Sequence, residues 1–308
     1  MLYFKYLLPI LFIFLQSTIV AANVKIEYKI GKDIITNLDI IDEKKYLIFL
    51  RPSLKNLQED EILKISKNSL IKDIIKKREI DRVFKDFENP KFISELKKRL
   101  FNFKKVKNES EFIEIINKNN IDYEKVIEKI KYEGLWNDLI YNKYGSLIKI
   151  NEDKLENELK VKILSNKKYE YNLSELIFEI EGSNKLKDKY EEILKFINEN
   201  DFRLAASKYS ISGNANIGGE IGWIKETMLS KKLLEIFRDM ETGVITDPIK
   251  HPNGYLILRI NDRRELKEEM DISKELNELI NFEKNRQLNQ FSLLYYKKLK
   301  QNTIINEY

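Results

Sequence analysis

The chain has 308 residues, of which 43% are hydrophobic and 34% charged, and its formal charge is +5. That length allows roughly two or three domains, and the composition is typical of a folded globular protein. The absence of cysteine excludes disulfides, thiolate metal sites and cysteine nucleophiles, and a single histidine, His251, excludes a histidine-cluster metal site. The small positive charge is spread along the chain, so no nucleic-acid partner is expected.

The first 22 residues have the pattern of a secretory signal. Lys5 gives a positive start, residues 6–15 are apolar, and a small-residue cleavage pattern follows, so the mature chain is expected to begin at Asn23. A retained N-terminal anchor is the alternative, but it needs about 20 apolar residues. Gln16 interrupts the run before that length is reached. We therefore predict an exported protein with a cleaved signal peptide, residues 1–22.

The next part of the chain predicts a short hairpin followed by helices. Residues 24–30 alternate as a strand does, a turn follows at 31–33, and Thr36 is expected to cap a helix. Helical spacing of apolar residues predicts further helices at 59–87, 90–103, 109–117, 123–144 and 152–164. Residues 23–167 are therefore expected to form a mostly helical domain.

The composition changes in the second half of the chain. Six of the ten glycines gather in one short stretch there, which is typical of tight turns between short elements. Residues 168–265 are therefore expected to form a compact α+β module. A long helical pattern returns at 266–299, with a short strand predicted at 303–305. We interpret residues 266–308 as completing the first domain, so that the module is carried between the two ends of the chain.

An ordered set of motifs in the module carries a family resemblance. The chain has NLSELIF at 172–178, DFRLAASKYS at 201–210, GGEIGW at 218–223, TGVITDPI at 242–249 and GYLILRI at 254–260. Their order and spacing resemble those of parvulin (PpiC-type) peptidyl-prolyl isomerase domains, and GGEIGW is the most specific of them. The resemblance implies a four-stranded antiparallel sheet with helices packed on it.

The flanking parts resemble the SurA family of chaperones. IGKDIITNLD at 30–39 is similar to the strand–turn segment that begins the N-terminal domain in that family. SurA proper usually carries two parvulin domains, whereas this chain has room for one. The resemblance implies an α+β fold: a mostly helical SurA-like N-terminal domain, a C-terminal helix and strand that pack on it, and a parvulin domain.

Prolyl isomerisation crosses a barrier of about 18–20 kcal/mol because the peptide C–N bond has partial double-bond character. Parvulins lower this barrier with an apolar proline pocket and a polar core of two histidines with a cysteine or aspartate. By resemblance, the peptide-binding residues are Ile221, Trp223, Leu229 and Leu233. The spacing of Leu229 and Leu233 predicts that both lie on one helix face. Phe237 continues the same stripe, so an ordinary core is the alternative interpretation.

The polar core of the family is missing from this sequence. Glu175 stands at the first histidine position and Leu256 at the second, while Ser212, or Ile211 if the loop shifts by one, takes the cysteine or aspartate position. Leu256 cannot form a hydrogen bond, and a carboxylate cannot replace paired imidazoles. Glu175 could still polarise a substrate; the other interpretation is a surface charge on an edge strand. His251 is interpreted as a solvated loop residue.

The resemblance implies a periplasmic chaperone or foldase that binds unfolded exported polypeptides, which in the SurA family are outer-membrane proteins. Without the histidines, the parvulin domain is expected to be a peptide-binding module with weak or no isomerase activity. An active isomerase that works through the pocket alone is the alternative, and a structural partner in the cell envelope is a third class. No cofactor, metal or nucleic acid is expected.

Overall fold

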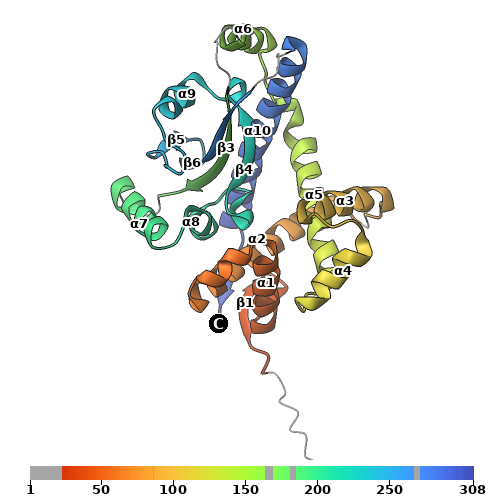
Figure 1. The fold of residues 1–308 in the computed structure, drawn as a ribbon. Helices are drawn as coiled ribbons and strands as arrows, with labels where there is room; N and C mark the ends of the chain where they lie inside the picture. Colours follow the sequence, from red (N-terminus) through yellow and green to blue (C-terminus); the bar gives the residue numbers. More distant parts are fainter. Residues whose placement is uncertain (1–22, 86, 164–168, 181–184, 267–270) are drawn as a thin grey trace, which may run out of the picture.

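The computed structural model describes residues 23–85, 87–163, 169–180, 185–266 and 271–308 (Figure 1). The predicted signal peptide lies outside these residues. The fold is α+β, as predicted: a mostly helical N-terminal part is completed by a C-terminal helix, and a second part is built on a four-stranded antiparallel sheet. Within the described ranges, no helix combines the length and the apolar character needed to cross a membrane.

The described chain begins with an antiparallel hairpin of β1 (Ile26–Ile30) and β2 (Asp33–Thr36), which leads directly into α1 (Asn37–Leu50). The helix begins where the sequence predicts. The backbone N–H of Thr36 donates to the Asp39 carboxylate at 2.8 Å, and the backbone N–H of Asp39 donates to the Thr36 hydroxyl at 3.2 Å. This reciprocal capping box satisfies donors that the first turn of a helix leaves free.

The helices that follow lie close to their predicted positions. They are α2 (Glu59–Val83), α3 (Pro90–Lys104), α4 (Glu109–Lys118), α5 (Tyr123–Tyr144) and α6 (Glu152–Ile163). The sequence extends α2 to residue 87, but the helix ends at Val83. The apolar pattern continues beyond it because Phe84 and Phe87 pack edge to face, with ring centroids 6.2 Å apart, in the connection to α3.

The C-terminal end of the chain returns to this N-terminal part. α10 (Ile272–Gln301) packs against α2, α5 and α6, and in Figure 1 it runs between α5 and the four-stranded sheet. β7 (Ile305–Glu307) then pairs antiparallel with β1 and completes a sheet in the order β2-β1-β7. The sequence predicts this strand slightly too early. Asn302 caps the end of α10, and Thr303 still belongs to the turn that follows, where its hydroxyl donates to the Leu299 carbonyl at 2.7 Å.

The second part contains an antiparallel sheet in the strand order β4-β3-β6-β5. Its strands are β3 (Tyr169–Phe178), β4 (Glu220–Lys225), β5 (Ile249–His251) and β6 (Gly254–Glu265). The helices on it are α7 (Leu186–Glu199), α8 (Phe202–Tyr209) and α9 (Lys231–Arg238). Residues of α7 and α8 pack on one face of the sheet, and residues of α9 pack on the other. This is the arrangement that the resemblance implies.

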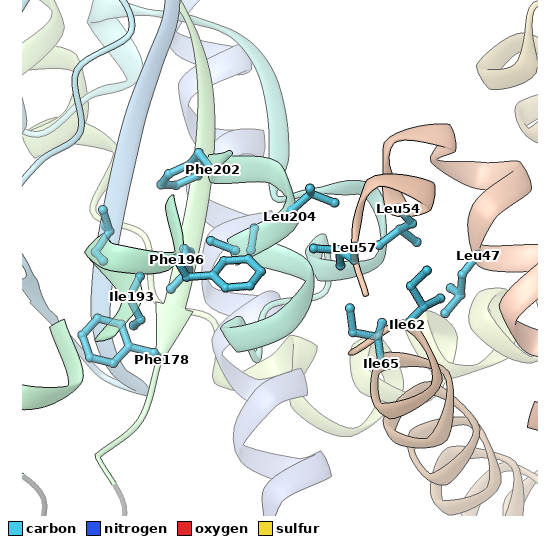
Figure 2. Packing of buried hydrophobic residues seen from close by; sticks show 14 residues of the cluster. Leu47, Leu54, Leu57, Ile62, Ile65, Phe178, Ile193, Phe196, Phe202 and Leu204 are labelled. Carbon is cyan, nitrogen blue, oxygen red and sulfur yellow. The ribbon is translucent and has the colours of Figure 1, made fainter. Parts of the chain in front are cut away.

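One buried cluster joins the two parts of the molecule (Figure 2). Side chains of α1, α2 and the 3-10 helix η1 (Pro52–Asn56) meet side chains of β3, β6, α7 and α8. The members labelled in Figure 2 are Leu47, Leu54, Leu57, Ile62, Ile65, Phe178, Ile193, Phe196, Phe202 and Leu204. Arg51, only 3% exposed, crosses the same junction and donates to the carbonyls of Arg203 and Ala215 at 3.1 and 3.3 Å. Nothing in the sequence indicates this continuity.

Candidate peptide-binding site

Glu175 lies on β3, which is an interior strand of the four-stranded sheet. Its register partner on β6 is Leu258, and its backbone N–H donates to the carbonyl of Gly219 at 2.8 Å. Because β3 has a neighbouring strand on both sides, the interpretation of Glu175 as a surface charge on an edge strand is wrong. The Glu175 side chain is half-buried.

Gly219 shows why the GGEIGW motif needs its glycine pair. The backbone at Gly219 has φ +73°, in the left-handed region, and a Cβ atom there would collide with the carbonyl oxygen of Glu175. Glycine tolerates this conformation and leaves room for the neighbouring strand. The motif therefore fixes how the start of β4 approaches β3 beside Glu175.

Two polar side chains approach the Glu175 carboxyl group. Asn214 Nδ2 lies 3.5 Å from Glu175 Oε1, at the outer limit of a hydrogen bond. Ser212 is 1% exposed, and its Oγ has no hydrogen bond of good geometry among the described residues, although it lies near enough to influence the carboxyl. Burial raises the pKa of Glu175, and the Ser212 hydroxyl partly offsets that rise. The structure thus brings Glu175 and Ser212 together.

Leu256 projects from the same face of the sheet as Glu175. It is the register partner of Ile177, and Glu175 lies two residues before Ile177 on β3. Side chains alternate along a strand, so Glu175, Ile177 and their partners on β6 share one face. A hydrocarbon and a carboxyl therefore occupy the two positions at which parvulins carry imidazoles. These two positions hold no pair of groups for concerted proton transfer or polarisation.

Apolar side chains cover the sheet face that carries Glu175. Leu229, 4% exposed, lies inside this apolar cluster, while Ile221 and Leu233 are half-buried at its surface. Leu229 is not helical: α9 begins after Ser230, whose hydroxyl accepts from the Leu233 backbone N–H at 3.3 Å. The prediction that Leu229 and Leu233 share a helix face is therefore wrong, although both belong to one cluster.

Trp223 does not join this cluster. Its neighbour Ile224 packs into the cluster, so the alternation along β4 directs Trp223 to the opposite face of the sheet. There the Arg264 guanidinium lies 4.1 Å from the centroid of the Trp223 ring and also pairs with Glu170. The structure therefore separates Trp223 from the other predicted peptide-binding residues, because a motif fixes sequence spacing and not the face of the sheet.

A lysine of α6 holds the segment that leads to α9. Lys162 Nζ donates to the carbonyls of Thr227 and Leu229 at 2.9 and 2.8 Å, and burial lowers its pKa. Glu275 of α10 accepts from the Thr227 hydroxyl at 3.3 Å and pairs with Lys225. Elements outside the module thus position the backbone at Leu229. No motif in the sequence marks Lys162 or Glu275, since both lie in ordinary charged helices.

His251 is not the solvated loop residue that the sequence predicts. It is the last residue of β5, pairs with Gly254 and is half-buried. Its Nδ1 accepts from the backbone N–H of Asn253 at 3.2 Å, and burial lowers its pKa, with a smaller contribution from Arg286. Throughout the described part of the chain, no group of three or more His, Asp or Glu side chains is arranged to hold a metal ion.

Comparison with known proteins gives a domain match: the PPIC-type PPIase domain, or rotamase, family matches residues 171–262. Chaperone SurA of Pseudomonas putida is 25% identical over 158 residues, which cover 48% of this chain and 36% of that protein. Chaperone SurA of Xanthomonas euvesicatoria is 34% identical over 67 residues, which cover 22% of this chain and 14% of that protein. The chain thus spans only a minor part of the length of these curated relatives.

Among solved structures, a protein described as one of two structurally related SurA-like chaperones of Campylobacter jejuni is 15% identical, with a TM-score of 0.36. The similarity covers 92% of this chain and 98% of that one. The family assignment depends on the domain match and on the curated relatives. Residues 171–262 match the PpiC-type rotamase domain family, and parts of the chain are similar to curated SurA chaperones.

Proposed function

We propose that this protein is a periplasmic chaperone for unfolded exported polypeptides, and that its parvulin domain binds peptide segments with weak or no isomerase activity. The observation that carries the proposal is the exchange of both histidine positions, to Glu175 and Leu256, beside an apolar surface that is retained. Catalytic groups serve only the reaction, whereas apolar contact serves binding. Loss of the catalytic groups with retention of the apolar contacts favours peptide binding over catalysis of isomerisation.

The apolar contacts available at this site suit transient binding. Ile221 and Leu233 are half-buried, so a ligand can bury their remaining surface at about 0.8 kcal/mol per CH₂ group. An extended client segment bound through a few such contacts keeps most of its freedom and leaves easily. A chaperone that must release its client needs that kind of binding.

The location and the clients rest on two further observations. The signal pattern of residues 1–22 supports export, and the curated relatives are named as SurA chaperones. We propose outer-membrane proteins as clients, because the resemblance to the SurA family described above implies clients of that class. Apolar and polar residues alternate along the strands of such proteins. Before the strands insert into a membrane, their apolar and aromatic side chains are exposed and can be bound.

Aggregation of a urea-denatured outer-membrane protein after dilution, followed by light scattering, tests this proposal. The purified protein should suppress scattering at near-stoichiometric ratios. Leu233→Asp should reduce the suppression strongly, because it places a charge on the apolar surface. Lys232→Asp is the matched control: Lys232 is an exposed neighbour on α9, so this variant should act as wild type. No suppression by the wild-type protein would contradict the proposal.

A further inference from the structure

Glu175 differs from the most deeply buried glutamates of the described chain in having no cationic partner. The four glutamates that the structure buries most deeply each have one, in the pairs Glu43–Lys129, Glu79–Arg82, Glu170–Arg264 and Glu275–Lys225. In the part of the chain that the structure describes, no Lys or Arg pairs with Glu175. Its carboxyl group is therefore half-buried and unneutralised.

A second polar group lies at the same place. Ser212 Oγ is buried, lies beside the carboxyl, and has no hydrogen bond of good geometry within the described residues. A buried polar atom without a partner costs free energy unless something supplies the missing bond. The Ser212 hydroxyl can donate one hydrogen to the Glu175 carboxylate but carries no charge, so it cannot neutralise the carboxylate. The group that completes the site is therefore a hydrogen-bond donor with a positive charge.

The surroundings restrict that donor further. Ile221, Leu233 and Leu256 are half-buried and belong to the apolar cluster on the same sheet face. A side chain that satisfies this site needs an apolar stem for the cluster and a cationic head for the acceptors, which describes Arg and Lys. A proline ring offers the stem alone and leaves the carboxyl unpaired.

We propose that this face of the parvulin domain is a subsite for an arginine or lysine side chain of the bound client. The stem packs on Ile221 and Leu233, and the head donates to the oxygens of the Glu175 carboxylate. Arginine is preferred, because its planar fork reaches two acceptors at once. The inference rests on the proposed peptide binding and names the class of segment that is bound.

Fluorescence anisotropy with a matched peptide series tests the subsite. The peptides share one extended apolar sequence and differ at a central position, which is arginine, its neutral isostere citrulline, norleucine or glutamate. Wild-type protein should bind the arginine peptide at least about tenfold more tightly than the citrulline peptide, the size of one charge-assisted hydrogen bond. Glu175→Gln should bring the two affinities within about twofold while norleucine binding persists.

Glu220→Gln is the control, since Glu220 is a partly exposed carboxylate on β4 that already pairs with Arg203. This variant should keep the arginine preference. Equal affinity of wild-type protein for the arginine and citrulline peptides, or a preference that survives Glu175→Gln, overturns the subsite and leaves peptide binding intact. Failure of every peptide to bind overturns the proposed function together with the subsite.

Discussion

At the scale of single residues, Glu175 has a carboxyl without a cationic partner among the described residues, at a position where burial opposes its charge. Burial raises the pKa of Glu175 above the ordinary glutamate value of 4.5, so the folded protein binds this proton more tightly than the unfolded chain does. Ionisation of Glu175 therefore favours unfolding. Stability from this group is complete below pH 4.5 and is lost as the pH rises through the raised pKa.

Glu175→Gln removes that ionisation and should stabilise the protein at neutral pH. Urea denaturation of both proteins between pH 4 and pH 7.5 measures the effect. The two should have similar unfolding free energies near pH 4, and the variant should become the more stable one as the pH rises. The difference between the two unfolding free energies cancels the contributions of the other titrating groups. A difference that does not change with pH would show that burial leaves the Glu175 pKa unshifted.

Much of the candidate site could be predicted from its motifs. The alignment places Glu175, Ser212 and Leu256 at the core positions, and the structure brings Glu175 and Ser212 together. The glycine of the motif at Gly219 allows its backbone to lie against the Glu175 carbonyl. The helix position of Leu229 could not be predicted from spacing alone. Helix α9 begins only after Ser230, whose hydroxyl caps it by accepting from the Leu233 N–H. An interval of four residues does not reveal where a helix starts.

At the scale of elements, α10 and β7 bind the end of the chain to its beginning. Tyr295 of α10 lies in a buried cluster with Trp136 of α5, and the two rings stack with centroids 5.8 Å apart. The Trp136 indole N–H also donates to Ser292 at 2.8 Å. We propose that residues 23–167 and 266–308 form one domain, with 168–265 as the second.

Deletion of residues 267–308 should unfold the N-terminal helical part, because it removes one side of the cluster around Trp136. The chain has two tryptophans, so Trp136 fluorescence can be followed in a Trp223→Phe background. Its emission should shift to the red, and the cooperative melt of the helical circular dichroism signal should disappear. A deletion of 303–308 removes β7 but keeps α10, and should leave Trp136 buried. A cooperative melt and unchanged emission after the longer deletion would contradict the shared domain.

The elements themselves follow from local sequence, but their ends depend on tertiary contacts. Thr36 and Asp39 mark the start of α1 because the capping box is a local device. β7 could not be placed as well. Its three residues are selected by pairing with β1, in which Ile30 lies opposite Ile305, and no periodic pattern encodes that partner.

At the scale of the whole molecule, the two parts share a core and a set of polar contacts. Leu54 and Leu57 reach the cluster that contains Phe202 and Leu204, as Figure 2 shows, while Arg51 binds carbonyls of the second part. These residues lie about 150 positions apart, for example Arg51 and Arg203 with a separation of 152. The sequence has no local signal for such pairing, so the α+β fold class could be predicted but the junction could not.

This junction matters for function because it leaves one sheet face for ligands. The face covered by α7 and α8 is committed to the shared core, whereas the opposite face carries Glu175 and the apolar cluster. Lys162 and Glu275 hold the backbone beside that cluster from α6 and α10. The frame of the molecule therefore positions the proposed peptide-binding face, although the groups that parvulins use for turnover are missing from it.

The measurement that tests this account most directly is the cis–trans exchange rate of a proline tetrapeptide that the protein binds, followed by NMR exchange spectroscopy. Catalytic groups of this kind contribute about 10²–10⁴-fold, so binding should be visible while exchange stays near the uncatalysed rate. Restoring both histidines, in a Glu175→His and Leu256→His variant, should recover part of the catalysis. Exchange by the wild-type protein as fast as in histidine-bearing parvulins, and unchanged by Glu175→Ala, would contradict the account.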